Sequence, residues 1–370
     1  MPRRCKPPEA GRARRCRAAG AALLLRAAAL LALIPPAAAE PWRVASFNAE
    51  LHRDGPGLLL RDLTRGESPQ IDAVVAVIAQ ARPDILALQG IDWDQDRAAL
   101  RALAGRLAAA GHGFPHLFAA RPNSGLATGQ DMDGDGRSGT PADSQGFGAF
   151  TGHRGIAVLS RFPILRDEVV DFSALAWADL PGALLPRHPD GRPFPSAAAL
   201  AAQRLSSTAH WVVPIALPDG GRLTLLTFQA GPPVFDGAED RNGRRNHDEI
   251  RLWQLYLDGA LDAAPPAGRF VIAGGANLDP ERGEGRHAAI RALLADPRLQ
   301  DPRPTGPDGD SATVHWPRVG RLRVDYVLPS ADWQVAGAGV FWPAPGAAMA
   351  DTVSRASRHR LVWVDLRAPR

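Results

Sequence analysis

The feature that most constrains the fold is a succession of short apolar runs, interrupted by a few segments with helical spacing. Short runs of alternating or continuous apolar residues predict β-strands, whereas apolar residues three and four positions apart predict helices. The predicted strands are residues 42–48, 84–89, 155–160, 211–215, 222–227, 269–273, 323–328, 337–342 and 361–366. The predicted helices are residues 71–81, 94–110, 247–261 and 287–294, and residues 111–152 form a long Gly-rich loop. This order predicts two packed sheets with helices outside them.

The composition indicates a folded body with little net charge. Of the 370 residues, 45% are apolar, which is enough for a sizeable core. The formal net charge is +4, but residues 1–39 hold eight basic residues and one acidic residue, which leaves about −3 for residues 40–370. A mildly acidic body argues against a protein that wraps a nucleic acid duplex through bulk charge.

The first 39 residues predict a secretory signal. A basic stretch precedes an apolar run over residues 18–34, and small residues then suit cleavage after Ala39. Arg26 interrupts the run, so a mis-assigned start codon and an uncleaved anchor are alternatives, although the run is too short for a stable membrane span. We therefore expect a secreted or periplasmic protein with residues 40–370 as one domain. Both cysteines lie in the signal, so the body has no disulfide and no thiolate metal site.

Five of the apolar runs carry polar or glycine residues at characteristic places. They are Arg43-Val-Ala-Ser-Phe-Asn48, Asp84-Ile-Leu-Ala-Leu-Gln-Gly90, Leu225-Leu-Thr-Phe-Gln229, Val271-Ile-Ala-Gly-Gly-Ala-Asn277 and Ser357-Arg-His-Arg-Leu-Val362. Together they resemble landmark segments of the endonuclease/exonuclease/phosphatase family, which has the deoxyribonuclease-I-like fold. The resemblance covers roughly residues 42–366. It implies an α/β fold, an α+β four-layer sandwich of two packed mixed β-sheets flanked by helices. It also implies metal-assisted hydrolysis of a phosphoester in a cleft at one end.

Four positions depart from the family's pattern, each in a different role. Gly90 stands where the family carries its metal-binding Glu, and glycine supplies no oxygen ligand for Mg²⁺. Gln229 replaces a His that stabilises the reacting phosphoryl group. Gly275 replaces the Asp that positions or deprotonates water, and losing a general base costs roughly 10²–10⁴ in rate. Arg358 replaces the Asp that orients the last His, so we expect that His to lack a carboxylate partner.

The resemblance also assigns candidate catalytic residues at the positions that keep the family's pattern. These are Asn48, Asn277, Asp325 and His359. His210 is a further candidate, with a hydrogen-bonded core histidine as an equally good interpretation.

Three carboxylates lie close in sequence to the altered positions. Asp92 and Asp94 follow Gly90, and Asp279 follows Gly275. They are candidate ligands for a rebuilt metal site, and we expect Mg²⁺ or Mn²⁺ to bind only if such a site exists.

Residues 131–136 place carboxylates at alternate positions and then a glycine, as in the front half of a calcium loop. The predicted Ca²⁺ ligands are Asp131, Asp133, Asp135 and Asp143. The Glu expected at the twelfth loop position is absent, because residue 142 is Ala. A polar surface turn is the alternative. Because closely spaced carboxylates repel one another unless a cation neutralises them, we favour Ca²⁺ binding.

A charged loop follows Gln229 and is similar to the loop of secreted bacterial members of the family. Its candidate anion contacts are Arg241, Arg244, Arg245 and His247, and Arg358 is a further one. The alternative is a solvated loop before a helix that Asn246 caps, with Glu249 three residues later.

The leading hypothesis is a secreted member of the family that is inactive or very weak as a phosphoesterase. Such a protein would bind an anionic or phosphorylated small molecule. One alternative is an active metal-dependent phosphodiesterase, nuclease or phosphatase with a rebuilt metal site. Another is a calcium-stabilised extracellular binding protein. The sequence gives no oligomeric state.

Overall fold

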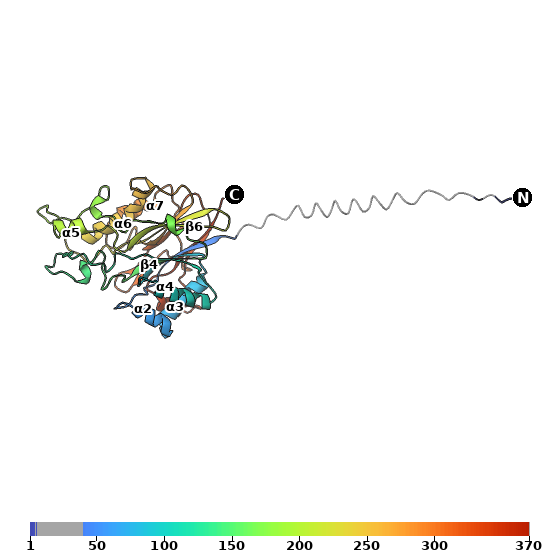
Figure 1. Cartoon of the computed structure of the whole chain (residues 1–370), viewed down its shortest axis with the longest axis horizontal. Helices are drawn as coiled ribbons and strands as arrows, with labels where there is room; N and C mark the ends of the chain where they lie inside the picture. Colours follow the sequence, from blue (N-terminus) through green and yellow to red (C-terminus); the bar gives the residue numbers. More distant parts are fainter. Residues whose placement is uncertain (4, 6–39, 370) are drawn as a thin grey trace. The chain divides into compact units, whose positions relative to one another are not determined.

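The computed structural model describes residues 1–3, 5 and 40–369. All described helices and strands lie in the compact unit that begins at Pro41 (Figure 1). The predicted signal, residues 1–39, lies almost entirely outside the described residues. Among the described residues, no helix combines the length and apolar character needed to cross a membrane.

The first sheet has six strands and is mixed. Its order is β12 (Gln334–Val340), β13 (Val362–Arg367), β1 (Trp42–Asn48), β2 (Ile85–Ile91), β4 (Gly155–Ser160) and β3 (His116–Phe118). β1 and β2 pair in parallel, and the other neighbours are antiparallel. The central strands are buried on both faces, which explains why β2 is apolar over most of its length rather than alternating.

The second sheet has five strands and is also mixed. Its order is β11 (Asp325–Pro329), β8 (Phe270–Gly275), β7 (Arg222–Gln229), β6 (Ala209–Ala216) and β5 (Val170–Asp171). β7 and β8 are parallel, and the remaining pairs are antiparallel. A separate short hairpin joins β9 (Val314–Trp316) and β10 (Gly320–Leu322).

Helices cover the outer face of each sheet (Figure 1). The first sheet packs against α2 (Leu58–Arg65), α3 (Pro69–Ala81), α4 (Ala98–Ala109) and α8 (Ala350–Ala356). The second packs against α6 (Arg241–Leu257) and α7 (Ala288–Leu294), with the short α5 (Ala197–Ala202) at its side. Three 3₁₀ turns are η1 (Pro141–Asp143), η2 (Arg166–Glu168) and η3 (Trp177–Asp179).

The two sheets bury a third apolar layer between them. Val44 and Ile85 of the first sheet lie in one cluster with Trp211, Val271 and Val327 of the second. Two helical layers and two sheets therefore make the four-layer sandwich, and the predicted fold class is confirmed.

The strand predictions were closer than the helix predictions. Residues 42–48 and 155–160 are strands with the predicted bounds. The helix predicted from residue 94 begins at Ala98, because the Asp94 carboxylate accepts hydrogen bonds from Ala98 N and Ala99 N at its start. The predicted loop 111–152 also contains β3 and η1.

The predicted helix cap at Asn246 was wrong. α6 begins at Arg241, and Asn246 lies inside it, fully buried. Its side-chain Nδ2 donates to the carbonyls of Gly231 and Ala276, both at 2.7 Å. This residue ties the helix to the loops after β7 and β8 instead of ending the helix.

Candidate functional site

The layer between the sheets becomes polar at one end. On the second sheet, Gln229, Gly275 and Asp325 form one row across β7, β8 and β11, because Gly275 is in register with both neighbours. On the first sheet, Ser46, Asn48 and Gln89 continue the inward-facing positions of β1 and β2. β1 packs against β8 and β11. We call these six residues the polar end.

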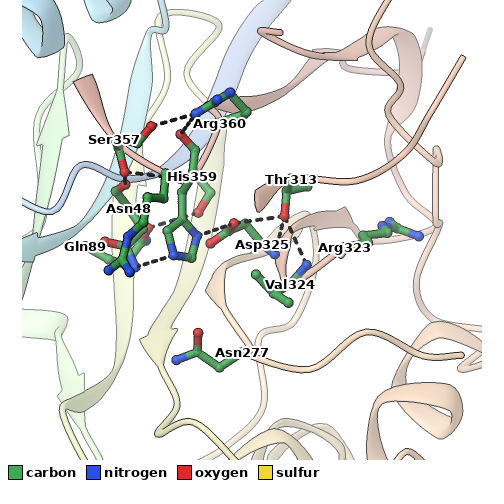
Figure 2. A network of polar contacts seen from close by, with 12 residues as sticks. Asn48, Gln89, Asn277, Thr313, Arg323, Val324, Asp325, Ser357, His359 and Arg360 are labelled. Carbon is green, nitrogen blue, oxygen red and sulfur yellow. Dashed lines mark hydrogen bonds and ion pairs between the residues drawn. The ribbon is translucent and has the colours of Figure 1, made fainter. Parts of the chain in front are cut away.

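A histidine–carboxylate pair lies at the polar end (Figure 2). His359 Nδ1 is 2.8 Å from Asp325 Oδ2, and both residues are buried. Thr313 Oγ1 donates to the same carboxylate oxygen at 2.9 Å. The expectation that His359 lacks a carboxylate partner was therefore wrong, because Asp325 takes the role that Arg358 cannot. A carboxylate in this place fixes the tautomer and the orientation of the imidazole.

Two asparagines approach this pair from opposite sheets. Asn48 Nδ2 lies 3.5 Å from His359 Nε2, and Asn277 Nδ2 donates to the Ala230 carbonyl at 2.8 Å. Figure 2 shows their side chains on different sides of the His359–Asp325 pair. Asn277 has a φ of +52°, a left-handed conformation that Asn tolerates better than most residues. Asn48 thus contacts the imidazole directly, whereas Asn277 is anchored to the loop after β7.

Gly275 and Gln229, the neighbours of Asp325 in the row across the second sheet, carry no carboxylate. A Cβ built on Gly275 would overlap the Gln229 side chain, so the amide fills the space that an acidic side chain would need. Gln229 Nε2 makes a long hydrogen bond of 3.5 Å to Ala230 O. Gln229 Oε1 and Asp325 Oδ1 are buried without a hydrogen-bond partner among the described residues. Both oxygens are exceptions to the rule that buried polar atoms are hydrogen-bonded.

Gly90 is required by its backbone and its neighbours. Its φ is +73°, and the register of β2 and β4 shifts between Gln89 and Ile91. A Cβ on Gly90 would lie 2.6 Å from Asn48 Oδ1 and 3.0 Å from Glu50 N. The turn after β1 therefore occupies the space in which a Glu at position 90 would begin.

Glu50 is a site residue that the sequence analysis missed. Its Oε1 accepts hydrogen bonds from Arg358 Nε, at 2.8 Å, and from Arg358 Nη2, while its Oε2 accepts from Arg358 N at 2.9 Å. Burial alone would raise the pKa of Glu50, but the bonds from Arg358 and the nearby His359 lower it to about 2. Glu50 is therefore a carboxylate ion at neutral pH.

The carboxylates predicted to rebuild a metal site do not converge. Asp92 accepts the backbone N–H groups of Arg53 and Arg154 at 2.8 and 3.1 Å. Its pKa is raised to about 6 by burial, against the effect of these bonds. Asp94 binds the start of α4. Asp279 accepts backbone N–H groups of Glu281, Arg282 and Arg323, and these bonds lower its pKa although burial opposes them.

The arginine-rich loop makes mostly internal contacts. Arg245 donates to the carbonyls of Leu205, Arg204, Ser206 and Gln145, so its guanidinium is committed to the backbone rather than open to an anion. Arg241 donates to Met132 O, and Arg244 donates to Glu239 O. His247 pairs with Asp248 at 2.9 Å. Arg358 pairs with Glu50.

His210 lies in the core, where its ring packs against α6. Its ring nitrogens contact Ser206 Oγ at 2.6 Å and Glu249 O at 2.9 Å, and none of its surface is exposed. Burial lowers its pKa to about 3. The structure therefore assigns His210 the second interpretation, a neutral and satisfied core histidine, and removes it from the candidate catalytic residues.

The acidic loop gathers three of its four predicted carboxylates. Asp131, Asp133 and Asp143 each place an oxygen within 4.8 Å of the others. Asp135 is outside this group and accepts Arg137 N. Backbone N–H groups already bind these carboxylates, including Met132 N on Asp143 at 2.9 Å. Ca²⁺ binding here stays a prediction.

Two mixed sheets, packed face to face with a His–Asp pair at one end, define the deoxyribonuclease-I-like class of sandwiches. The chain belongs to the endonuclease/exonuclease/phosphatase family, whose sequence model matches residues 45–359. The family acts on phosphoester bonds.

Solved structures agree with this fold. An endonuclease/exonuclease/phosphatase from Beutenbergia cavernae DSM 12333 aligns with a TM-score of 0.52 and 17% identity, over 89% of this chain and 72% of that one. A family protein from Leptotrichia buccalis C-1013-b aligns with a TM-score of 0.51 and 16% identity, over 88% and 99%. Identities this low support the fold alone. No curated protein matches the chain significantly.

The polar end does not fit the divalent metal ion that the family's chemistry implies. Gly90 has no ligand atom, and the Glu50 carboxylate is held by Arg358. Within the described residues, the one group of three acidic or histidine ligand atoms close enough for a shared ion is in the acidic loop. Mg²⁺ requires several hard oxygen ligands in a near-octahedral arrangement, which these residues do not supply.

Proposed function

We propose that this protein binds the phosphoryl group of an anionic or phosphorylated small molecule and hydrolyses it very slowly or not at all. One observation carries the proposal. The Gln229 amide fills the space above Gly275, so no carboxylate stands where an attacking water would need a base. The groups that remain at the polar end are suited to binding.

Binding would use hydrogen-bond donors around the imidazole. Asn48 Nδ2 lies beside His359 Nε2, and Asn277 Nδ2 keeps a second hydrogen beyond the one that it gives to Ala230. The Asp325 carboxylate, fixed by Thr313, holds the ring in place through its contact with Nδ1. Oriented donors of this kind recognise phosphate oxygens and cost little reorganisation.

A combined assay tests the two halves of the proposal. The full chain would be titrated with inorganic phosphate by calorimetry, and hydrolysis of bis(p-nitrophenyl) phosphate would be followed with Mg²⁺ or Mn²⁺. We expect phosphate binding that H359A and N277A weaken, and a hydrolysis rate equal to that of the metal ion alone. H188A is the control, because His188 hydrogen-bonds Pro195 O in a different region.

The alternative of an active, metal-dependent phosphodiesterase predicts a different result. Metal-dependent turnover that H359A abolishes would overturn the proposed inactivity. The positions of Asp92, Asp94 and Asp279 speak against this alternative, because each carboxylate is already bound to local backbone N–H groups.

We also propose that residues 1–39 direct export and are removed after Ala39, as their basic, apolar and small-residue order indicates. Mass spectrometry of the mature N-terminus would test this proposal. A mature chain that begins at Met1 would contradict it.

A further inference from the structure

The Glu50–Arg358 ion pair is the most unusual charged contact near the polar end. Arg358 alone gives Glu50 three N–H donors, two from its guanidinium and one from its backbone. Ser357 Oγ lies 3.1 Å from Glu50 Oε2 and 2.8 Å from Asn48 O. A carboxylate offers about four lone-pair sites, so Glu50 has little left for a metal ion.

The ion pair belongs to the same local network as the candidate phosphate contacts. Ser357 Oγ accepts the backbone N–H of His359 at 3.0 Å, and it also contacts the Asn48 carbonyl. Asn48 Oδ1 in turn accepts Glu50 N at 3.4 Å. Arg358 is therefore joined to the Asn48–His359 contact through Glu50 and Ser357, and it directly precedes His359 in the chain.

The Arg358 guanidinium is accessible to a partner other than Glu50. Its side chain is 60% exposed, whereas that of Glu50 is 15% exposed. Among the residues that the structure describes, Arg358 Nη1 has no hydrogen-bond partner, so one edge of the fork is open. A guanidinium binds phosphate oxygens in the same two-pronged manner in which it binds a carboxylate.

We propose that Arg358 takes the place of the divalent cation, so that the site binds a phosphoryl group without a metal ion. The inference rests on the proposed function, since it names the charge that draws the phosphoryl group to the polar end. It accounts for the poor fit to a metal ion, because the position next to Glu50 is already filled by a tethered and permanently charged group. In this arrangement Glu50 competes with the ligand for Arg358.

Calorimetry with inorganic phosphate, in EDTA and again with Mg²⁺, tests the inference on the full chain. We expect equal affinity in both buffers. R358A should weaken binding by about tenfold or more, because it removes charge-assisted hydrogen bonds. E50Q should bind phosphate at least as tightly as the unchanged chain, since it frees the guanidinium. R222A is the control, because Arg222 is 50% exposed, against 60% for Arg358, and pairs with Glu168 elsewhere.

Effects of E50Q and R358A on phosphate affinity that are opposite to those expected would identify a metal site. If phosphate bound only with Mg²⁺, and if E50Q abolished that binding while R358A strengthened it, Glu50 would be a metal ligand and the inference would fail. The proposed phosphate binding would survive that result. If phosphate bound under neither condition, the proposed function would fail and the inference with it. R358K separates charge from geometry, and circular dichroism checks that each variant is folded.

Discussion

At the scale of single residues, Gly275 and Gln229 have to be considered together. The two residues are in register on β8 and β7, and the Gln229 side chain lies where a Cβ on Gly275 would be. A protein interior has few voids, so the volume that one residue gives up is taken by its neighbour. The residue types at 275 and 229 are therefore coupled through packing.

This coupling predicts non-additive effects of substitution. G275D should lower the free energy of unfolding by about 1–3 kcal/mol, because the new side chain meets Gln229 in a packed interior. G275D/Q229A should recover most of that loss, since Ala at 229 vacates the space. Urea denaturation measures both, with Q229A alone as the control. Equal stability of G275D and the unchanged chain would show that Gln229 moves aside without cost.

Single residues also show where sequence analysis reaches its limit. The motifs pointed to Asn48, Asp325 and His359, and the structure brings these three to one place. They did not reveal Glu50, because its φ of +50° breaks the strand period that predicts side-chain direction. The partner of Glu50, Arg358, lies 308 residues away in the sequence. No local pattern encodes a contact over that distance.

At the scale of elements, α6 shows why helix starts were harder to predict than strands. Its first turn is polar and contains Gly243, and Asp240 before it has a φ of +52°. A residue outside the helix stabilises this turn, because Arg286 forms an ion pair of 2.6 Å with Asp240. Tertiary contacts therefore override a sequence that favours a later start. Strands β1 and β4 were predictable because a strand that is buried on both faces has a short, mostly apolar sequence.

The buried His210 of β6 predicts a loss of stability in acid. Burial lowers its pKa from an ordinary value near 6.5 to about 3. Between these values the unfolded chain binds a proton that the folded chain does not, so stability falls as pH decreases through this window. From pH 7 to pH 5 the loss from this one group is about 2 kcal/mol. Urea denaturation at pH 7 and pH 5 measures the difference.

The variant H210F isolates this contribution. It should be less stable at pH 7, because Ser206 Oγ and Glu249 O lose a partner. Its stability should nevertheless change less between pH 7 and pH 5 than that of the unchanged chain. If both proteins lost the same amount, His210 would not be the titrating group.

The acidic loop predicts stabilisation by Ca²⁺. Burial and the neighbouring charges of Asp135 and Asp143 raise the pKa of Asp133, as expected for carboxylates that crowd without a cation. At a Ca²⁺ concentration of 100 times Kd, the gain would be about 2.7 kcal/mol. D133N should abolish the rise in Tm on adding Ca²⁺, whereas D135N, outside the group of three, should keep it. A rise in Tm that D133N leaves unchanged would place the ion elsewhere.

At the scale of the whole molecule, the fold closes by pairing its first strand with its last. β1 lies between β13 and β2, antiparallel to one and parallel to the other. The segment that carries Arg358 and His359 reaches the polar end because β13 follows it directly. The layers follow from local apolar patterns, whereas the site depends on this long-range closure, which explains why the sequence predicted the fold better than the site.

The same closure predicts where the folded unit can be shortened. A fragment of residues 40–370 keeps all of β1 and should unfold in urea with the same midpoint as the full chain. A fragment of residues 50–370 lacks Val44 and Phe47, both buried, and also the central partner of two strands. Each buried apolar side chain contributes about 1.5–3 kcal/mol, against a typical total stability of 5–15 kcal/mol. We therefore expect the shorter fragment to show no cooperative unfolding transition by tryptophan fluorescence or circular dichroism. A cooperative transition in residues 50–370 would mean that the first sheet forms without its central strand. A lower midpoint for residues 40–370 would mean that residues before Glu40 contribute to the stability of the folded unit.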